Sequence, residues 1–130
     1  MTKRQKSAAP FDFDGQMQAN LARVFGERDA DKRMAAIDEL YAEDAVLYEP
    51  DTSVTGRAGI NGVLTALLSS LPPDFSFIAT GPAVGHHGLG WMRWRAGSPK
   101  DPVAVTGMDV AHFEDGLIQT LHVFIEPARA

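Results

Sequence analysis

Residues 106–126, TGMDVAHFEDGLIQTLHVFIE, are the most informative stretch of the sequence for the fold. Two segments rich in β-branched and aromatic residues, 103–113 and 117–126, flank the residues Glu114-Asp115-Gly116. An Asp-Gly pair between two such segments predicts a β-hairpin. Asp109 lies in the middle of the first segment, although aspartate is disfavoured in strands and costly to bury as a charge. We therefore expect its carboxyl either on the solvated face of the sheet or inside a pocket where it has a function.

The composition sets the class of protein. A chain of 130 residues fits one domain with one core. Its net charge of −5 argues against nucleic acid or an anionic membrane as a partner. The chain has no cysteine, which excludes disulfides and thiol catalysis. The basic start, MTKRQKSAAP, has no apolar region after it and does not resemble a signal peptide, so we predict a cytoplasmic protein.

Helical patterns dominate the first part of the chain. Residues 1–13 are predicted to be a flexible tail that precedes a single domain, 14–130. Three segments then carry apolar residues at helical spacing. The first has Met17, Leu21, Val24 and Phe25; the second has Met34, Ile37, Leu40 and Tyr41; the third has Ile60, Val63, Leu64, Leu67, Leu68 and Leu71. Asp29 or Asp31 can cap the second helix, and Pro72-Pro73 ends the third.

Strand patterns dominate the second part. A short strand at 45–49 and a loop at 50–56 separate the second and third helices, and strands follow at 75–84, at 89–96 and in the hairpin. The order is α-α-β-α-β-β-β-β. Helices grouped early and strands grouped late favour an α+β fold, with helices packed on one face of an antiparallel sheet. Such a curled sheet, closed on one side by helices, forms a cone with an internal cavity.

This order resembles the NTF2-like superfamily, as do LYAEDAVLYEP (40–50), GRAGI (56–60) and DVAHFEDGLIQTLHVFIE (109–126). Within it, the chain is similar to the SnoaL-like polyketide cyclases and the ketosteroid isomerases, over residues 15–127. The resemblance implies a curved antiparallel sheet wrapped around three N-terminal helices. It also implies a cavity for a small hydrophobic ligand and chemistry without a cofactor.

The isomerases of this superfamily suggest roles for particular residues. Their general-base carboxylate ends the short strand after the second helix, just before a proline, and Glu49 holds that position here. Their carboxylic acid lies in the strand that opens the final hairpin, which places Asp109 on it. Their tyrosine on the first helix falls on Val24, which has no hydroxyl. The last aspartate of the related epoxide hydrolases falls near Val123.

Asp109 and Glu49 are therefore the predicted catalytic acid and base. Burial in a hydrophobic pocket would raise a carboxyl pKa toward neutrality and give one neutral donor beside one ionised acceptor. The alternatives are that Asp109 is a buried ion-pair partner of Arg93 and that Glu49 is solvated. The remaining predicted ligand-binding residues are Trp91, Arg93, Val24, Leu47 and Val123. Strand parity leaves a second arrangement open, in which the arginines face solvent and Trp94 packs inside.

The histidines are assigned other roles. His86-His87 lies between glycines and indicates a turn, and no metal-ligand spacing occurs, so no metal site is predicted. His112 and His122 are expected on the outer sheet face, where they would help to form a homodimer. The predicted function is proton transfer on a small apolar ligand, as in an isomerase, polyketide cyclase or dehydratase. The alternative is a non-catalytic ligand-binding or dimerisation domain.

Overall fold

The computed structural model describes residues 10–126. The helical elements are α1 (Phe13–Asn20), the π-helical turn η1 (Leu21–Phe25), α2 (Ala30–Leu40) and α3 (Arg57–Ser69). The strands are β1 (Tyr41–Glu49), β2 (Thr52–Thr55), β3 (Ser76–Ala79), β4 (Val84–His86), β5 (Leu89–Ser98), β6 (Asp101–Glu114) and β7 (Leu117–Ile125). The predicted α+β class is confirmed. Within the described residues, no helix is both long and apolar enough to cross a membrane.

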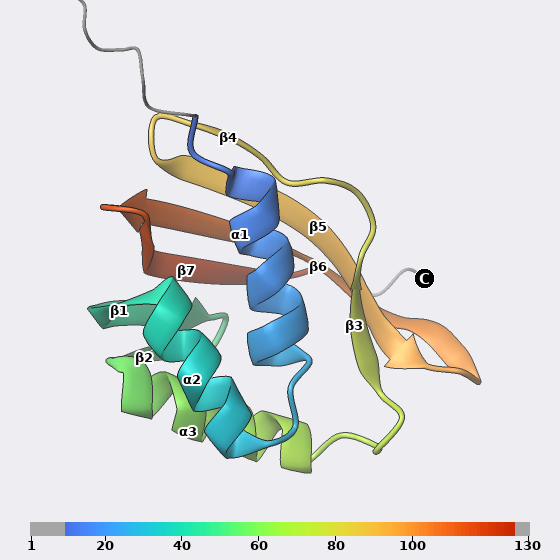
Figure 1. Cartoon of the computed structure of the whole chain (residues 1–130). Helices are drawn as coiled ribbons and strands as arrows, with labels where there is room; N and C mark the ends of the chain where they lie inside the picture. Colours follow the sequence, from blue (N-terminus) through green and yellow to red (C-terminus); the bar gives the residue numbers. More distant parts are fainter. Residues whose placement is uncertain (1–9, 127–130) are drawn as a thin grey trace, which may run out of the picture.

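The strands form one curved sheet in the order β2-β1-β7-β6-β5-β3, with β4 paired to β5 (Figure 1). The predicted hairpin is confirmed: β6 and β7 are antiparallel and joined by Asp115 and Gly116, both with positive φ. The sheet was predicted to be antiparallel and is mixed, because β1 pairs with β7 in parallel. This pair joins strands far apart in the chain, so no local turn in the sequence signals it.

Several strand boundaries also differ from the prediction. Strand β1 begins at Tyr41, which was predicted on the second helix, and not at residue 45. The predicted loop 50–56 contains β2, which folds back on β1 through the pair Glu49 and Thr52. The predicted strand 75–84 is interrupted around Gly81-Pro82 and forms two short strands, β3 and β4. Proline lacks the N–H that a sheet ladder needs, which explains the interruption.

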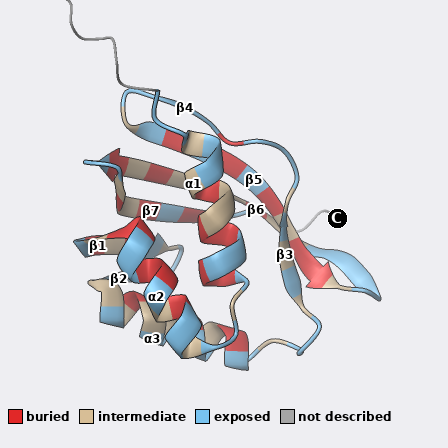
Figure 2. Cartoon of the chain, viewed as in Figure 1, coloured by how far each residue is buried: buried red, intermediate tan, exposed pale blue. Residues whose placement is uncertain are grey.

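The helices cover the concave face of the sheet, and the core lies between the two layers (Figure 1, Figure 2). Asp29 caps α2 by accepting hydrogen bonds from the backbone N–H groups of Asp31 and Lys32, as the sequence predicts. The stripe on the first helix is also confirmed, although its second half is π-helical, with Gly26 N–H donating to the Leu21 carbonyl at 2.9 Å. This turn keeps Leu21, Val24 and Phe25 buried together.

The predicted tail, residues 1–13, falls mostly outside the described residues, which begin at residue 10. Its last part is structured. Phe13 begins α1, and the rings of Phe11 and Phe13 lie 4.8 and 5.6 Å from the ring of Phe113. These contacts attach the start of the domain to the sheet.

Candidate functional site

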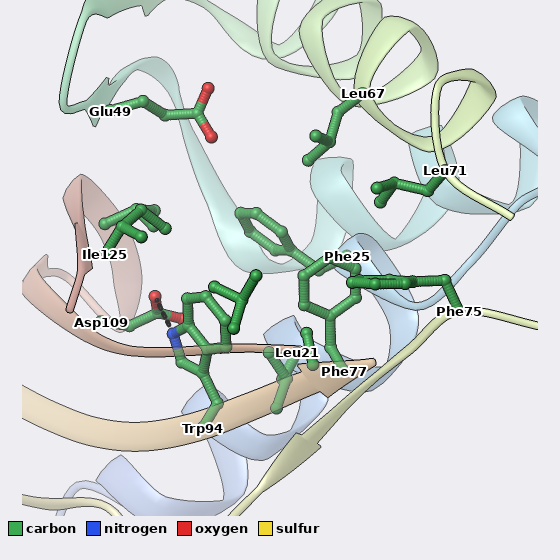
Figure 3. A pocket seen from close by; sticks show the side chains of 13 residues that line it. Leu21, Phe25, Glu49, Leu67, Leu71, Phe75, Phe77, Trp94, Asp109 and Ile125 are labelled. Atoms are coloured by element: carbon green, nitrogen blue, oxygen red, sulfur yellow. Dashed lines mark hydrogen bonds between the residues drawn. The ribbon is translucent and has the colours of Figure 1, made fainter. Parts of the chain in front are cut away.

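A cavity of about 230 Å³ lies between the helices and the concave face of the sheet (Figure 3). Its walls are apolar except for two carboxyl groups. The lining residues are Leu21, Phe25, Glu49, Leu67, Leu71, Phe75, Phe77, Trp94, Ala96, Val105, Asp109, Val123 and Ile125. The π-helical turn contributes Leu21 and Phe25, which is consistent with the frequent occurrence of such turns at functional sites.

Asp109 reaches this cavity from the middle of β6. Its side chain is only 2% exposed, and its Oδ1 accepts a hydrogen bond of 2.9 Å from the indole Nε1 of Trp94. Burial raises the pKa of Asp109 from 3.8 to about 7; the negative charge of Glu49 also raises it, and the Trp94 hydrogen bond opposes the rise. Asp109 therefore carries a proton up to about neutral pH, as a general acid requires.

Glu49 reaches the same cavity from the end of β1. It is half-buried, and its carboxylate points into the cavity from the wall opposite Phe75 (Figure 3). Burial raises the Glu49 pKa, and the charge of Asp51 raises it further. Because Glu49 is closer to solvent than Asp109, it loses its proton first, and its charge then opposes the ionisation of Asp109. The structure thus brings the two predicted carboxyls into one cavity.

The predicted placement of Trp91 and Arg93 in the cavity is wrong. Asp109 pairs with Met92 across β5 and β6, so Met92, Trp94 and Ala96 share its face. Trp91 is 42% exposed on the opposite face. There Arg93 donates to Glu126 at 2.9 Å, so it is not the ion-pair partner of Asp109. The alternative parity, with Trp94 inside, is the one observed.

Of the three apolar residues predicted to contact a ligand, one lines the cavity and two belong to the core. Val123 lines the cavity. Val24 and Leu47 are 0% and 1% exposed and belong to the core, outside the cavity lining. Val24 follows the stripe of the first helix and Leu47 the inner face of β1, so both contribute packing and not contact with a ligand.

A second buried polar pair lies near Asp109 and was not predicted as part of the site. The Tyr41 hydroxyl donates to Asn20 Oδ1 at 2.5 Å, and both residues are at most 1% exposed. Burial and the charge of Asp109 raise the Tyr41 pKa well above its usual value. The sequence feature that could have predicted this pair is Asn20, which lies among the apolar positions of the first helix, since a buried amide needs a hydrogen-bond partner.

The histidines lie away from the cavity. His86 ends β4, and His87 has positive φ in the turn that follows, as the glycines around them predict. His122 is exposed on the outer face, where its ring stacks between Tyr48 and Phe124 at centroid distances of 4.6 and 6.3 Å. Among residues 10–126, no three His, Cys, Asp or Glu side chains gather as a metal site would require.

The sequence matches a family model described as the SnoaL-like domain over residues 20–121. The chain belongs to the SnoaL-like family. No functionally curated protein matches the sequence.

Solved structures agree with this assignment. One, from Agrobacterium tumefaciens, is named as a suggested isomerase of the SnoaL-like family; it is 24% identical, with a TM-score of 0.80 over 87% of this chain and 96% of its own. A suggested polyketide cyclase from Sinorhizobium meliloti is 18% identical, with a TM-score of 0.66 over 86% and 95%. An NTF2-like protein of unknown function from Cytophaga hutchinsonii is 12% identical, with a TM-score of 0.61 over 95% and 96%. The NTF2-like fold is thereby confirmed.

The raised Asp109 pKa predicts a specific dependence of stability on pH. Between its usual value of 3.8 and about 7, the folded protein holds a proton that the unfolded chain has released. Stability therefore falls as pH rises through this window and levels off above it. Asp109→Asn removes this effect. Its free energy of unfolding, relative to wild type, should rise between pH 4 and pH 8 by a few kcal/mol, at about 1.4 kcal/mol per pKa unit.

Urea denaturation at several pH values measures this difference. The control is Asp115→Asn, the same acid-to-amide substitution in the exposed hairpin turn, outside the cavity lining. If the Asp109→Asn difference is constant with pH, Asp109 is ionised in the folded protein at acidic pH, contrary to the account.

Proposed function

We propose that this protein binds a small, uncharged, largely apolar carbonyl compound and moves a proton on it. The class of reaction is that of an isomerase, polyketide cyclase or dehydratase, without a cofactor. The observation that carries the proposal is the pair Asp109 and Glu49, two carboxyl groups of unequal proton affinity in one apolar cavity. Near neutral pH, one is suited to give a proton and the other to take one.

The proposed step uses both groups. The Glu49 carboxylate removes a proton from the carbon next to the carbonyl, and the electrons of that C–H bond form a C=C bond. Asp109 donates a hydrogen bond or a proton to the carbonyl oxygen, where negative charge develops. A buried donor aimed at that oxygen is effective because little water competes with it. Return of the proton to another carbon gives isomerisation.

The cavity also limits the ligand. Among the described residues that line it, none is basic, and two are acidic. A carboxylate or phosphate ligand would meet like charge in a desolvated site, which is unfavourable. The volume of about 230 Å³ exceeds a benzene-binding cavity of about 150 Å³ by less than a factor of two. These features support a neutral ligand of one or two rings.

A second candidate function is non-catalytic binding of the same class of ligand. It is favoured by the nearly complete apolar lining and by the partial exposure of Glu49, which lets solvent reach the proposed base. The two functions share a ligand and differ in whether Glu49 accepts its proton.

We also propose that the protein is a homodimer through the outer sheet face. Tyr48, His122 and Phe124 form an exposed aromatic row there, and Trp91 and Leu89 are exposed as well. Such contiguous apolar surface is typical of interaction sites, and a two-fold contact is self-complementary. A cytoplasmic location stays a prediction from the sequence.

Proton exchange on 2-tetralone, a two-ring ketone, tests the catalytic proposal. In D₂O, wild type should accelerate replacement of the protons next to the carbonyl, as followed by NMR. Glu49→Gln removes the base and should lower the rate by about 10²-fold or more. Asp109→Asn replaces an acid by a weaker donor and should lower it by about tenfold or more. Asp115→Asn, far from the cavity, should exchange at the wild-type rate.

Two outcomes contradict the proposal. A wild-type rate in Glu49→Gln would show that another group or solvent takes the proton. Binding of 2-tetralone to wild type with no acceleration would instead favour the non-catalytic candidate.

Light scattering tests the dimer. Wild type should have twice the mass of the chain at micromolar concentration. Phe124→Asp places a charge in the aromatic row and should shift the protein toward monomer while leaving 2-tetralone binding in place, because Phe124 does not line the cavity. A monomeric wild type would contradict the proposal.

A further inference from the structure

Gly107 creates the space in which the indole of Trp94 lies. The two residues face each other across β6 and β5. A Cβ atom at Gly107 would lie 2.3 Å from Cζ2 and 2.8 Å from Cε2 of Trp94, and 2.5 Å from the Phe124 carbonyl oxygen. Any larger residue would therefore displace the indole or the strand. Glycine inside a strand often marks such a close approach.

The indole lies across β6 and meets Asp109, two residues beyond Gly107. Trp94 is 4% exposed, and the ring of Phe77 contacts it nearly edge-on, at a centroid distance of 5.8 Å. The indole is thus held on one side by the strand and on another by an aromatic ring. Its Nε1–H lies 2.9 Å from Asp109 Oδ1, a normal hydrogen-bond length for this pair.

This hydrogen bond favours one of the two carboxyl oxygens as the site of the proton. An indole N–H only donates, so Asp109 Oδ1 must accept. When Asp109 is neutral, this hydrogen bond favours the form in which Oδ1 is the carbonyl oxygen and Oδ2 carries the proton, because the carbonyl oxygen is the better acceptor. Within residues 10–126, no group donates a hydrogen bond to Oδ2. Figure 3 shows the Asp109 carboxyl beside the indole nitrogen of Trp94, with Glu49 on another wall of the same cavity.

We propose that Trp94, seated over Gly107, is a positioning residue that holds the Asp109 carboxyl with its proton on Oδ2, directed into the cavity. Trp94 thereby selects the direction in which the acid donates. This inference rests on the proposed function of Asp109 and extends it to a residue outside the acid/base pair. Without the indole, the carboxyl can rotate, and its proton can occupy either oxygen.

The groups around Asp109 permit a clear test. Two residues of β1, Glu49 and Tyr41, interact electrostatically with Asp109, and Trp94 of β5 donates a hydrogen bond to it. The helical elements present apolar side chains to the cavity, such as Leu21, Phe25 and Leu67. Of these groups, Trp94 is the one that hydrogen-bonds to Asp109 and opposes its raised pKa. Trp94→Phe removes the N–H donor and keeps an aromatic ring.

The first readout is the titration of the Asp109 carboxyl carbon by carbon-13 NMR. Loss of a donor that favours the charged form should move its midpoint upward by roughly half to one pH unit in Trp94→Phe. Trp91→Phe changes the exposed tryptophan on the opposite face and should leave the midpoint unchanged. A merely structural role for Trp94 would lower the melting temperature without this shift.

The second readout is the exchange of 2-tetralone protons. Trp94→Phe should lower the maximal rate by about tenfold, with a smaller change in the concentration for half-maximal rate, because the donor is misdirected more than the ligand is displaced. Its pH profile should shift upward with the midpoint. Gly107→Ala, where it folds, should act in the same direction by displacing the indole.

The results separate this inference from the proposed function. An unshifted midpoint in Trp94→Phe overturns the inference, as does a wild-type exchange rate, even if wild type is an active catalyst. Absence of exchange in wild type contradicts the proposed function. The carbon-13 titration then still decides whether Trp94 controls the Asp109 carboxyl.

Discussion

The site depends on one constraint, the burial of the Asp109 carboxyl on the concave face of the sheet. An ionised carboxylate there would lack the solvation of water, and a single indole N–H compensates for only part of that loss. The group therefore keeps its proton up to about neutral pH. The protonated carboxyl can contact a ligand because it lines a cavity and is not covered by packed side chains.

The sheet and the helical elements form different walls of that cavity. β5, β6 and β7 form the curved wall that carries Trp94, Asp109 and Val123, while η1 and α3 cover it with apolar side chains. β1 joins the sheet beside β7 and ends at Glu49, so the second carboxyl enters from the rim. One carboxyl at the wall and one at the rim experience different solvation, and this difference separates their proton affinities.

Much of this arrangement was predictable from the sequence. The hairpin, the helical stripes and the two carboxyls follow from periodicity and turn residues, and the family resemblance placed Glu49 and Asp109 in one site. The wrong predictions concern residues whose side of the sheet depends on the pairing register of the strands, which a single sequence does not specify. A shift of one residue in pairing β5 with β6 exchanges Trp91 for Trp94, and alternation alone cannot choose between them.

Gly107 was the missed signal, since a glycine in a strand of β-branched residues indicates a close neighbour. Arg33, buried between α2 and α3 and donating to Asn61 and Thr65, also escaped prediction, because charged residues are expected outside.

Difference infrared spectroscopy between wild type and Asp109→Asn tests the central claim most directly, because it observes the protonation state of one carboxyl. We predict a protonated carboxylic acid band in wild type that is absent from Asp109→Asn and gives way to a carboxylate band only near pH 7. If the difference spectrum shows a carboxylate throughout the range above about pH 5, where an unperturbed aspartate is ionised, Asp109 is not a neutral acid and the account is contradicted.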